Sequence, residues 1–294
     1  MRFISYLING ISLGSVYAII ALGYTMVYGI AKMLNFAHGD IIMVGSYVIF
    51  CLMSGAGVSP LISVLISIVA CTALGITVEA IAYRPLRGAA SSLAVLITAI
   101  GVSYFLQNMA LLIFGANTKQ FTSVIKMDPI MIADGKITIT GETIVTVVCC
   151  LIIMIVLLTF INKTKAGQAM LAVSEDQGAA RLMGINVNGT ISLTFAIGSG
   201  LAAIAGMLLC SSYPSLTPYT GSMPGIKAFV AAVFGGIGSI PGAFIGGIIL
   251  GIIEILSKAY ISSQLSDAIV FMVLIIVLLV KPTGLLGRMI QEKV

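Results

Sequence analysis

Long stretches without a charged residue constrain this chain more than any other feature of its sequence. The residues from Phe3 to Ala31 carry no charge, and neither do those from Ile41 to Val78. A helix needs about 20 apolar residues to cross the hydrocarbon core of a bilayer. Charged residues make up 9% of the chain, against about 25% in soluble domains. The chain therefore has too little polar surface for a soluble globule and is predicted to be an integral membrane protein.

The apolar runs predict an all-α, polytopic membrane helix bundle that forms a single transmembrane domain over residues 1–294. We expect about seven full spans and one broken or re-entrant span within residues 228–253. The full spans are expected at residues 3–31, 91–114, 143–161, 190–212 and 261–280, with two more inside 41–78. Residues 211–225 contain three prolines and are expected to form a loop.

Residues 116–141 are polar and predict a small extracytoplasmic loop that holds one hairpin. Residues 137–140 alternate in polarity like a short strand, and Asp134-Gly135 is a hairpin-turn signal.

Basic residues cluster after three of the predicted spans, and such clusters favour the cytoplasmic side. The clusters comprise Arg84 and Arg87; Lys163, Lys165 and Arg181; and Lys281, Arg288 and Lys293. All three can be cytoplasmic only if residues 228–253 do not make a simple single crossing. This arrangement puts the C-terminus in the cytoplasm and the N-terminus outside. Three lysines of the 116–141 loop then also lie outside, which leaves the side of the N-terminus open.

The predicted broken span is interrupted by glycines, a serine and a proline. A break in a spanning helix leaves backbone groups unpaired unless protein or a water-filled path covers it. One interpretation places these residues on a translocation path or gate; the other is close helix packing without such a role. The residues concerned are Gly235, Gly236, Gly238, Ser239 and Pro241.

Asn35, His38 and Asp40 form a polar cluster between the first two spans. Ionisable groups near membrane depth are costly and are usually placed for a function. One interpretation is that this cluster holds a helix break beside a translocation path and gates the path. The other is that it caps the second span at the membrane interface. His38 is the only histidine, so we expect neither a metal site nor a catalytic triad.

The loop at residues 162–189, here called the coupling segment, is predicted to contain a short helix. Ser174, Glu175 and Asp176 supply acceptors at its start, and Gly184 can end it in a left-handed conformation. Asn186 and Asn188 can then cap the next span. The segment either docks onto a soluble partner or is an ordinary solvated loop.

Two further charged groups are expected to be structural. Glu79 is one turn from Arg84 and close to Arg87, which predicts an interfacial ion pair. Glu254 and Lys258 have the i,i+4 spacing that favours an ion pair on a helix.

Four separated motifs together resemble the H-like membrane subunits of Liv-type ABC importers for branched-chain amino acids. They are residues 21–40, with Asn9-Gly10 before them, and residues 175–186, 229–243 and 281–287. The resemblance covers essentially the whole chain. Asp40 stands where that family often has Glu, a change that keeps the carboxylate.

The resemblance implies a permease subunit of the bacterial inner membrane that works by alternating access. It implies four kinds of partner: a second permease subunit, two ATP-binding subunits, an external substrate-binding protein and an amino-acid substrate. Contact with the ATPase would fall to Glu175, Asp176, Ala179, Ala180, Arg181 and Gly184. The chain contains no G-x-x-x-x-G-K-[ST] motif, so ATP hydrolysis by that route would have to occur in another subunit.

No cofactor and no nucleic-acid partner is expected, since the basic residues sit at span ends. Two alternatives stay open. A permease of the same family can carry urea or short amides. A self-sufficient, ion-coupled secondary transporter would use His38, Asp40 and Glu79 as a proton relay and the glycine-rich break as its binding site.

Overall fold

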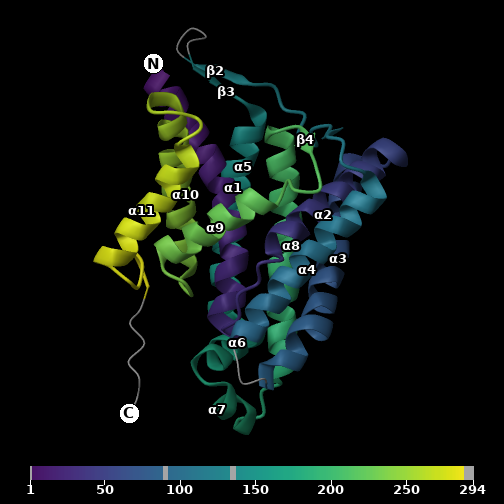
Figure 1. Ribbon diagram of the computed structural model, residues 1–294, viewed down its shortest axis with the longest axis vertical. Helices are drawn as coiled ribbons and strands as arrows, with labels where there is room; N and C mark the ends of the chain where they lie inside the picture. Colours follow the sequence, from purple (N-terminus) through teal and green to yellow (C-terminus); the bar gives the residue numbers. More distant parts are fainter. Residues whose placement is uncertain (1, 89–91, 133–136, 288–294) are drawn as a thin grey trace.

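The protein is an elongated bundle of helices that run roughly side by side (Figure 1). A computed structural model describes residues 2–88, 92–132 and 137–287. Among these residues, seven helices are long and apolar enough to cross a membrane. The predicted class, a polytopic helical membrane bundle with about seven spans, is confirmed.

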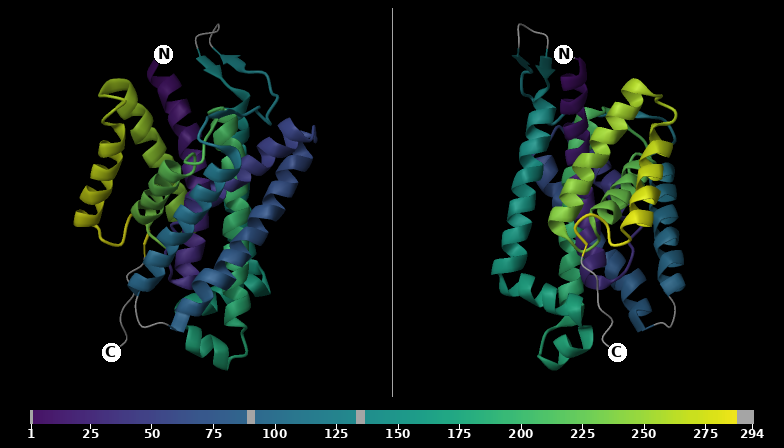
Figure 2. Two further views of the ribbon diagram at one scale, coloured as in Figure 1. Left: turned by 45° about the vertical axis from the view of Figure 1, so that its right-hand side comes forward. Right: turned by 90° about the vertical axis from the view of Figure 1, so that its left-hand side faces the viewer.

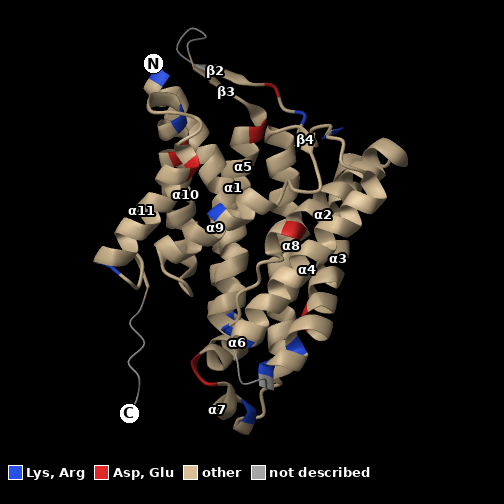
Figure 3. Cartoon of the chain, in the orientation of Figure 1, with Lys and Arg blue, Asp and Glu red and all other residues tan. Residues whose placement is uncertain are grey.

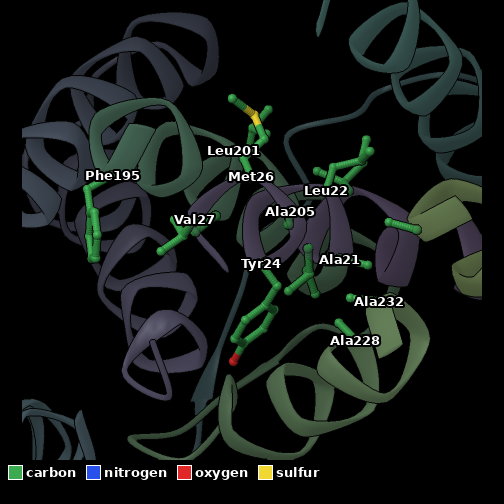
Figure 4. Packing of buried hydrophobic residues seen from close by; sticks show 14 of the residues in the cluster. Ala21, Leu22, Tyr24, Met26, Val27, Phe195, Leu201, Ala205, Ala228 and Ala232 are labelled. Carbon is green, nitrogen blue, oxygen red and sulfur yellow. The ribbon is translucent and has the colours of Figure 1, made fainter. Parts of the chain in front are cut away.

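Helix α1 (Arg2–Ala31) lies at the centre of the bundle. Most of its second half is buried, and it packs against α8 (Val187–Ser212), α9 (Ser222–Gly235) and α10 (Ile240–Tyr260). Figure 4 shows Ala21, Leu22 and Tyr24 of α1 among alanines of α8 and α9. Small side chains let these helices approach closely, and such contacts stabilise helix pairs in lipid, where apolar burial alone gives little.

The remaining helices surround this centre. Helix α2 (His38–Phe50) is extended by a π-helical turn at Cys51–Gly55. Helix α3 (Pro60–Val78) continues through a π-helical turn, Glu79–Tyr83, into a 3-10 turn, Arg84–Gly88. The others are α4 (Ser92–Phe114), α5 (Gly141–Lys163), α6 (Lys165–Glu175), α7 (Gln177–Leu182) and α11 (Ser266–Val280).

The predicted broken span is a helical hairpin made of α9 and α10. Gly235 lies against Gly242, and Gly246 against Ala231, while Lys227 bonds to Glu254. These successive pairs show that the two legs run antiparallel. The sequence-based expectation that residues 228–253 make no simple crossing is therefore confirmed.

Two boundaries differ from the sequence-based expectation. The loop predicted at residues 211–225 is shorter, because α9 already begins at Ser222. The span predicted at residues 261–280 is the 15-residue helix α11, about 22 Å long at 1.5 Å per residue. Hydrogen bonds made by the hydroxyl groups of Ser262 and Ser266 hold residues 262–266 in a turn before α11. The seventh full-length span is instead α10.

Short strands gather at the end of the bundle that holds the N-terminus (Figures 1 and 2). Strand β2 (Ile130–Ile132) pairs antiparallel with β3 (Ile137–Ile139), which confirms the predicted hairpin. The expected turn at Asp134-Gly135 lies outside the described residues. Strand β1 (Lys119–Gln120) pairs with β4 (Ser215–Leu216) and ties the loop before α5 to the loop after α8.

Candidate functional site

The coupling segment forms two short helices, α6 and α7, where the sequence predicted one. Asp176 is the N-cap of α7: its Oδ1 accepts hydrogen bonds from the backbone N–H groups of Gly178, at 2.7 Å, and Ala179, at 2.9 Å. Gly184 has a φ of +82°, the left-handed conformation expected of a helix stop. Asn186 caps α8 by accepting a bond from Gly189 N–H at 3.0 Å.

Three other capping predictions were wrong. Glu175 is the last residue of α6 and does not start a helix. Ser174 donates to the carbonyl of Leu171 in the preceding turn. Asn188 lies inside α8 and accepts a hydrogen bond from Arg87 at 2.8 Å. The Ser174 and Asn188 side chains therefore bond to groups that another turn or another helix brings to them.

The tip of the coupling segment exposes apolar side chains. Leu182 is 90% exposed and Met183 is 82% exposed. They end helix α7, which extends beyond the other helices of the bundle together with α6 (Figures 1 and 2). Glu175, Asp176 and Arg181 of the same segment are also exposed, whereas Ala180 is buried. The tip therefore presents a small apolar knob with a charged rim.

Helix α6 anchors this tip to the bundle. Met170 and Val173 are fully buried, and α6 packs against α1 and α8. A cavity of about 80 Å³ lies between α6, α1 and the start of α10, with Leu171 and Gly238 on its walls. The coupling segment thus adjoins the break between α9 and α10.

The break itself is fixed by two glycines in the left-handed region. Gly236 has a φ of +106° and Gly238 a φ of +90°, which other residues adopt only with strain. Ser239 then caps α10 by accepting a hydrogen bond from Gly242 N–H at 3.2 Å, and Pro241 occupies the first turn.

A segment after α11 covers one side of the break. The N–H groups of Leu285 and Leu286 donate, each at 2.9 Å, to the carbonyl oxygens of Phe234 and Gly235 at the end of α9. These bonds satisfy carbonyl groups that a broken helix would otherwise leave unpaired in lipid.

Asn35 and His38 lie deep in the bundle. The Asn35 Oδ1 accepts a hydrogen bond from the Tyr83 hydroxyl at 2.9 Å, and Asn35 Nδ2 has no protein partner among the described residues. His38 packs edge-on against the Tyr24 ring, and its Nε2 also lacks such a partner. His38 fits only because Gly23 has no side chain: a Cβ there would lie 2.6 Å from Nε2.

Asp40 points elsewhere. It is buried, and its Oδ1 accepts a hydrogen bond at 2.8 Å from Gln107 of α4, which also bonds to Ser222 of α9. The cap position of α2 is Ala37, which makes no side-chain bond. Asp40 therefore links three helices in the interior instead of capping α2 at an interface.

The predicted path residues are only partly brought together. A small cavity between α1 and α9 has Tyr24, Tyr28, Asn35 and Phe229 on its walls, together with Ile237 of the break. Asn35 and the break thus share one cavity. His38 and Asp40 are not on its lining.

Glu79 forms the ion pairs expected from the sequence. Its carboxylate accepts from Arg84 at 2.8 Å, contacts Arg87, and also accepts from the Ser192 hydroxyl of α8 at 2.6 Å. Lys and Arg residues gather at this end of the bundle, near α6 and α7 (Figure 3).

The sequence predicted only part of a second charged cluster, which is centred on Glu254. Glu254 pairs with Lys258 at 2.6 Å, as expected, but it also accepts from Lys227 and from the Tyr17 hydroxyl, both at 2.8 Å. Lys227 also pairs with Asp267 at 2.7 Å. A lone lysine at the edge of an apolar run was the available signal, because such a charge needs a buried partner.

Tyr213, in the loop after α8, lies beside this cluster. Burial raises the pKa of its phenol, and the nearby Glu254 carboxylate raises it further. The hydroxyl therefore stays protonated at neutral pH and can donate a hydrogen bond.

Comparison with known proteins matches residues 6–278 to the family described as "branched-chain amino acid transport system / permease component". The permease protein LivH of Salmonella typhimurium is 45% identical over 100% of this chain and 98% of its own length. BraD of Pseudomonas aeruginosa is 43% identical over the same shares. A probable LivH of Methanocaldococcus jannaschii is 28% identical over 92% of this chain and 88% of its own. The chain belongs to the family of permease components of branched-chain amino acid transport systems.

Proposed function

We propose that this chain is the membrane-spanning permease subunit of an ATP-driven importer for branched-chain amino acids. Its relatives, LivH and BraD, are named as permeases of high-affinity branched-chain amino acid transport systems and match along the whole chain. This match favours amino acids over urea or short amides as the substrate. The chain would work with a second permease subunit, two ATP-binding subunits and an external substrate-binding protein.

The observation that carries the proposal is the exposed apolar tip of α7. A solvated loop has no reason to hold Leu182 and Met183 almost fully exposed next to each other. A soluble subunit with an apolar groove would bury both side chains, and basic residues of its rim would meet Glu175 and Asp176. The tip is the expected contact with an ATP-binding subunit.

Movement at the tip has a direct physical route into the bundle. Helix α6 packs on α1, and the cavity beside it is bounded by Gly238 of the break. A push on α7 from the ATPase would therefore tilt α6 against α1 and the α9–α10 hairpin. Alternating access follows if this tilt opens the bundle on one side as it closes on the other.

Asn35, His38 and the glycine-rich break are the proposed gate. Asn35 Nδ2 and His38 Nε2 are buried polar groups without a protein partner among the described residues, and such groups are costly unless water or a solute meets them. Asp40 would hold α2, α4 and α9 in register beside the gate.

The proposed setting is the bacterial cytoplasmic membrane. Lys and Arg residues gather at the end of the bundle that carries α7 (Figure 3), and positive residues favour the cytoplasm. They include Lys163 at the end of α5, Lys165 at the start of α6, Arg181 in α7, and Arg84 and Arg87, which bond to Ser192 and Asn188 near the start of α8. This orientation places the ATPase contact and the C-terminus inside, and the N-terminus and the strands outside.

The test replaces the apolar tip by charge. In the complete importer, Leu182→Glu combined with Met183→Glu is expected to weaken binding of the ATP-binding subunit by roughly tenfold or more, as loss of a central contact does. Uptake of radiolabelled leucine should fall with it. Co-purification and uptake in reconstituted vesicles measure the two effects.

Gln168→Glu is the matched control, because Gln168 is an exposed residue of α6 away from the tip. It should leave both measurements unchanged. Wild-type binding in the tip variant would contradict the docking role. Leucine uptake by this chain alone under a proton gradient would favour a secondary transporter instead.

A further inference from the structure

A third cavity, of about 300 Å³, opens at the end of the bundle opposite α7. It lies between α1, α8, α10 and the loop that leads into α9, away from the proposed gate. Its size falls at the lower end of the range for small-molecule sites, which bind a few polar groups within a largely apolar wall.

One charged group of the cavity wall has bonding capacity left. Lys258 lines the cavity and its side chain is 39% exposed. Its partner Glu254 is 1% exposed and already shares its charge with Lys227 and the Tyr17 hydroxyl. An ammonium group has three N–H donors, so Lys258 can still donate to an anion in the cavity.

The rest of the wall holds both polar and apolar groups. Thr217 and Thr220 bring hydroxyl groups from the loop after β4, 3.2 Å from each other. Leu13, Leu209 and Pro224 are apolar residues of the same wall. A ligand that matches both kinds of group, together with the Lys258 ammonium, carries a carboxylate and a short aliphatic group.

We propose that this cavity is an outer binding site for a small aliphatic carboxylate, with Lys258 as the residue that binds the carboxylate. This rests on the proposed function in one respect: a branched-chain amino acid is such a compound. Glu254 also lines the cavity and is a positioning residue, because its ion pair holds the Lys258 ammonium at the cavity wall.

The test measures binding to the purified full-length chain in lipid nanodiscs by equilibrium dialysis. Three probes separate the two ends of the ligand: leucine, 4-methylpentanoate, which lacks the amino group, and 3-methylbutylamine, which lacks the carboxylate. Leucine and 4-methylpentanoate are expected to bind, and the amine is not.

Lys258→Met is expected to weaken leucine binding roughly tenfold to hundredfold, the loss of one hydrogen bond to a charged group. Lys258→Arg should retain most of the binding. Lys126→Met is the control, because it removes an exposed positive charge from a loop at the same end of the bundle.

Three results would overturn the proposal: equal binding of the amine and leucine, unchanged binding in Lys258→Met, or no binding of any probe at millimolar concentration. The probe series uses the wild-type chain, so it decides even if a variant fails to fold. Lys258-dependent binding together with an inert α7 tip would overturn the docking role of the tip and leave this site standing. Loss of ATPase binding in the tip variant, together with no Lys258-dependent binding, would rule out this site and leave the docking role standing.

Discussion

Gly14→Val is expected to prevent the bundle from assembling. A Cβ at Gly14 would lie 2.7 Å from both the Cα and the carbonyl oxygen of Ile248 in α10. These are backbone atoms, so no rotamer change can relieve the clash, and the two helices would have to separate. We expect a loss at or beyond the upper end of the roughly 1–3 kcal/mol that overpacking costs.

The separation would spread along the whole contact between α1 and α10. Gly247 lies as close to Ala18, where an added Cβ would be 2.5 Å from the Ala18 Cα. Helices in lipid are stabilised by such close packing rather than by apolar burial. Loss of this contact therefore removes most of the packing that holds α10 in position. The α9–α10 hairpin would be displaced with α10.

Gly101→Val is the matched control. Gly101 lies in the middle of α4 and an added Cβ there meets nothing within 4 Å. Thermal unfolding and size-exclusion profiles in mild detergent compare the two variants. A Gly14→Val protein that elutes and melts like Gly101→Val would contradict the packing described here.

The sequence could predict that α1 packs tightly, but not against which helix. Gly10, Gly14 and Ala18 recur every four residues on one face of the helix and indicate a close partner. The partner helix is α10, more than 200 residues away along the chain, and nothing local distinguishes it from other glycine-rich helices. The spans themselves were predictable because length and hydropathy are local properties.

In the candidate site, too, local features were predictable from the sequence and long-range contacts were not. The caps at Asp176, Gly184 and Asn186 follow from neighbouring residues and were predicted. The cover of the break by Leu285 and Leu286 joins residues about 50 positions apart in the chain, and neither segment signals the other. Asp40 was expected beside His38 because only Gly39 separates them in sequence, yet helix geometry directs Asp40 to Gln107 on α4.

Glu254→Leu is expected to destabilise the protein by about 3–5 kcal/mol, the usual cost of removing one partner from a buried ion pair. Glu254 is 1% exposed and meets Lys227, Lys258 and the Tyr17 hydroxyl. Without it, the Lys227 ammonium, on a side chain 7% exposed, keeps only Asp267 as an ionic partner among the described residues.

A second substitution tests this cause. Adding Lys227→Met to Glu254→Leu removes the stranded charge and should recover most of the lost stability, since apolar groups of similar size can replace a buried ion pair at little cost. Lys258→Met alone should have a much smaller effect, because Lys258 is partly exposed and Glu254 keeps its other two partners. Unfolding free energies in mixed detergents measure all four proteins. A double variant no more stable than Glu254→Leu would show that the carboxylate stabilises the bundle by some means other than balancing Lys227.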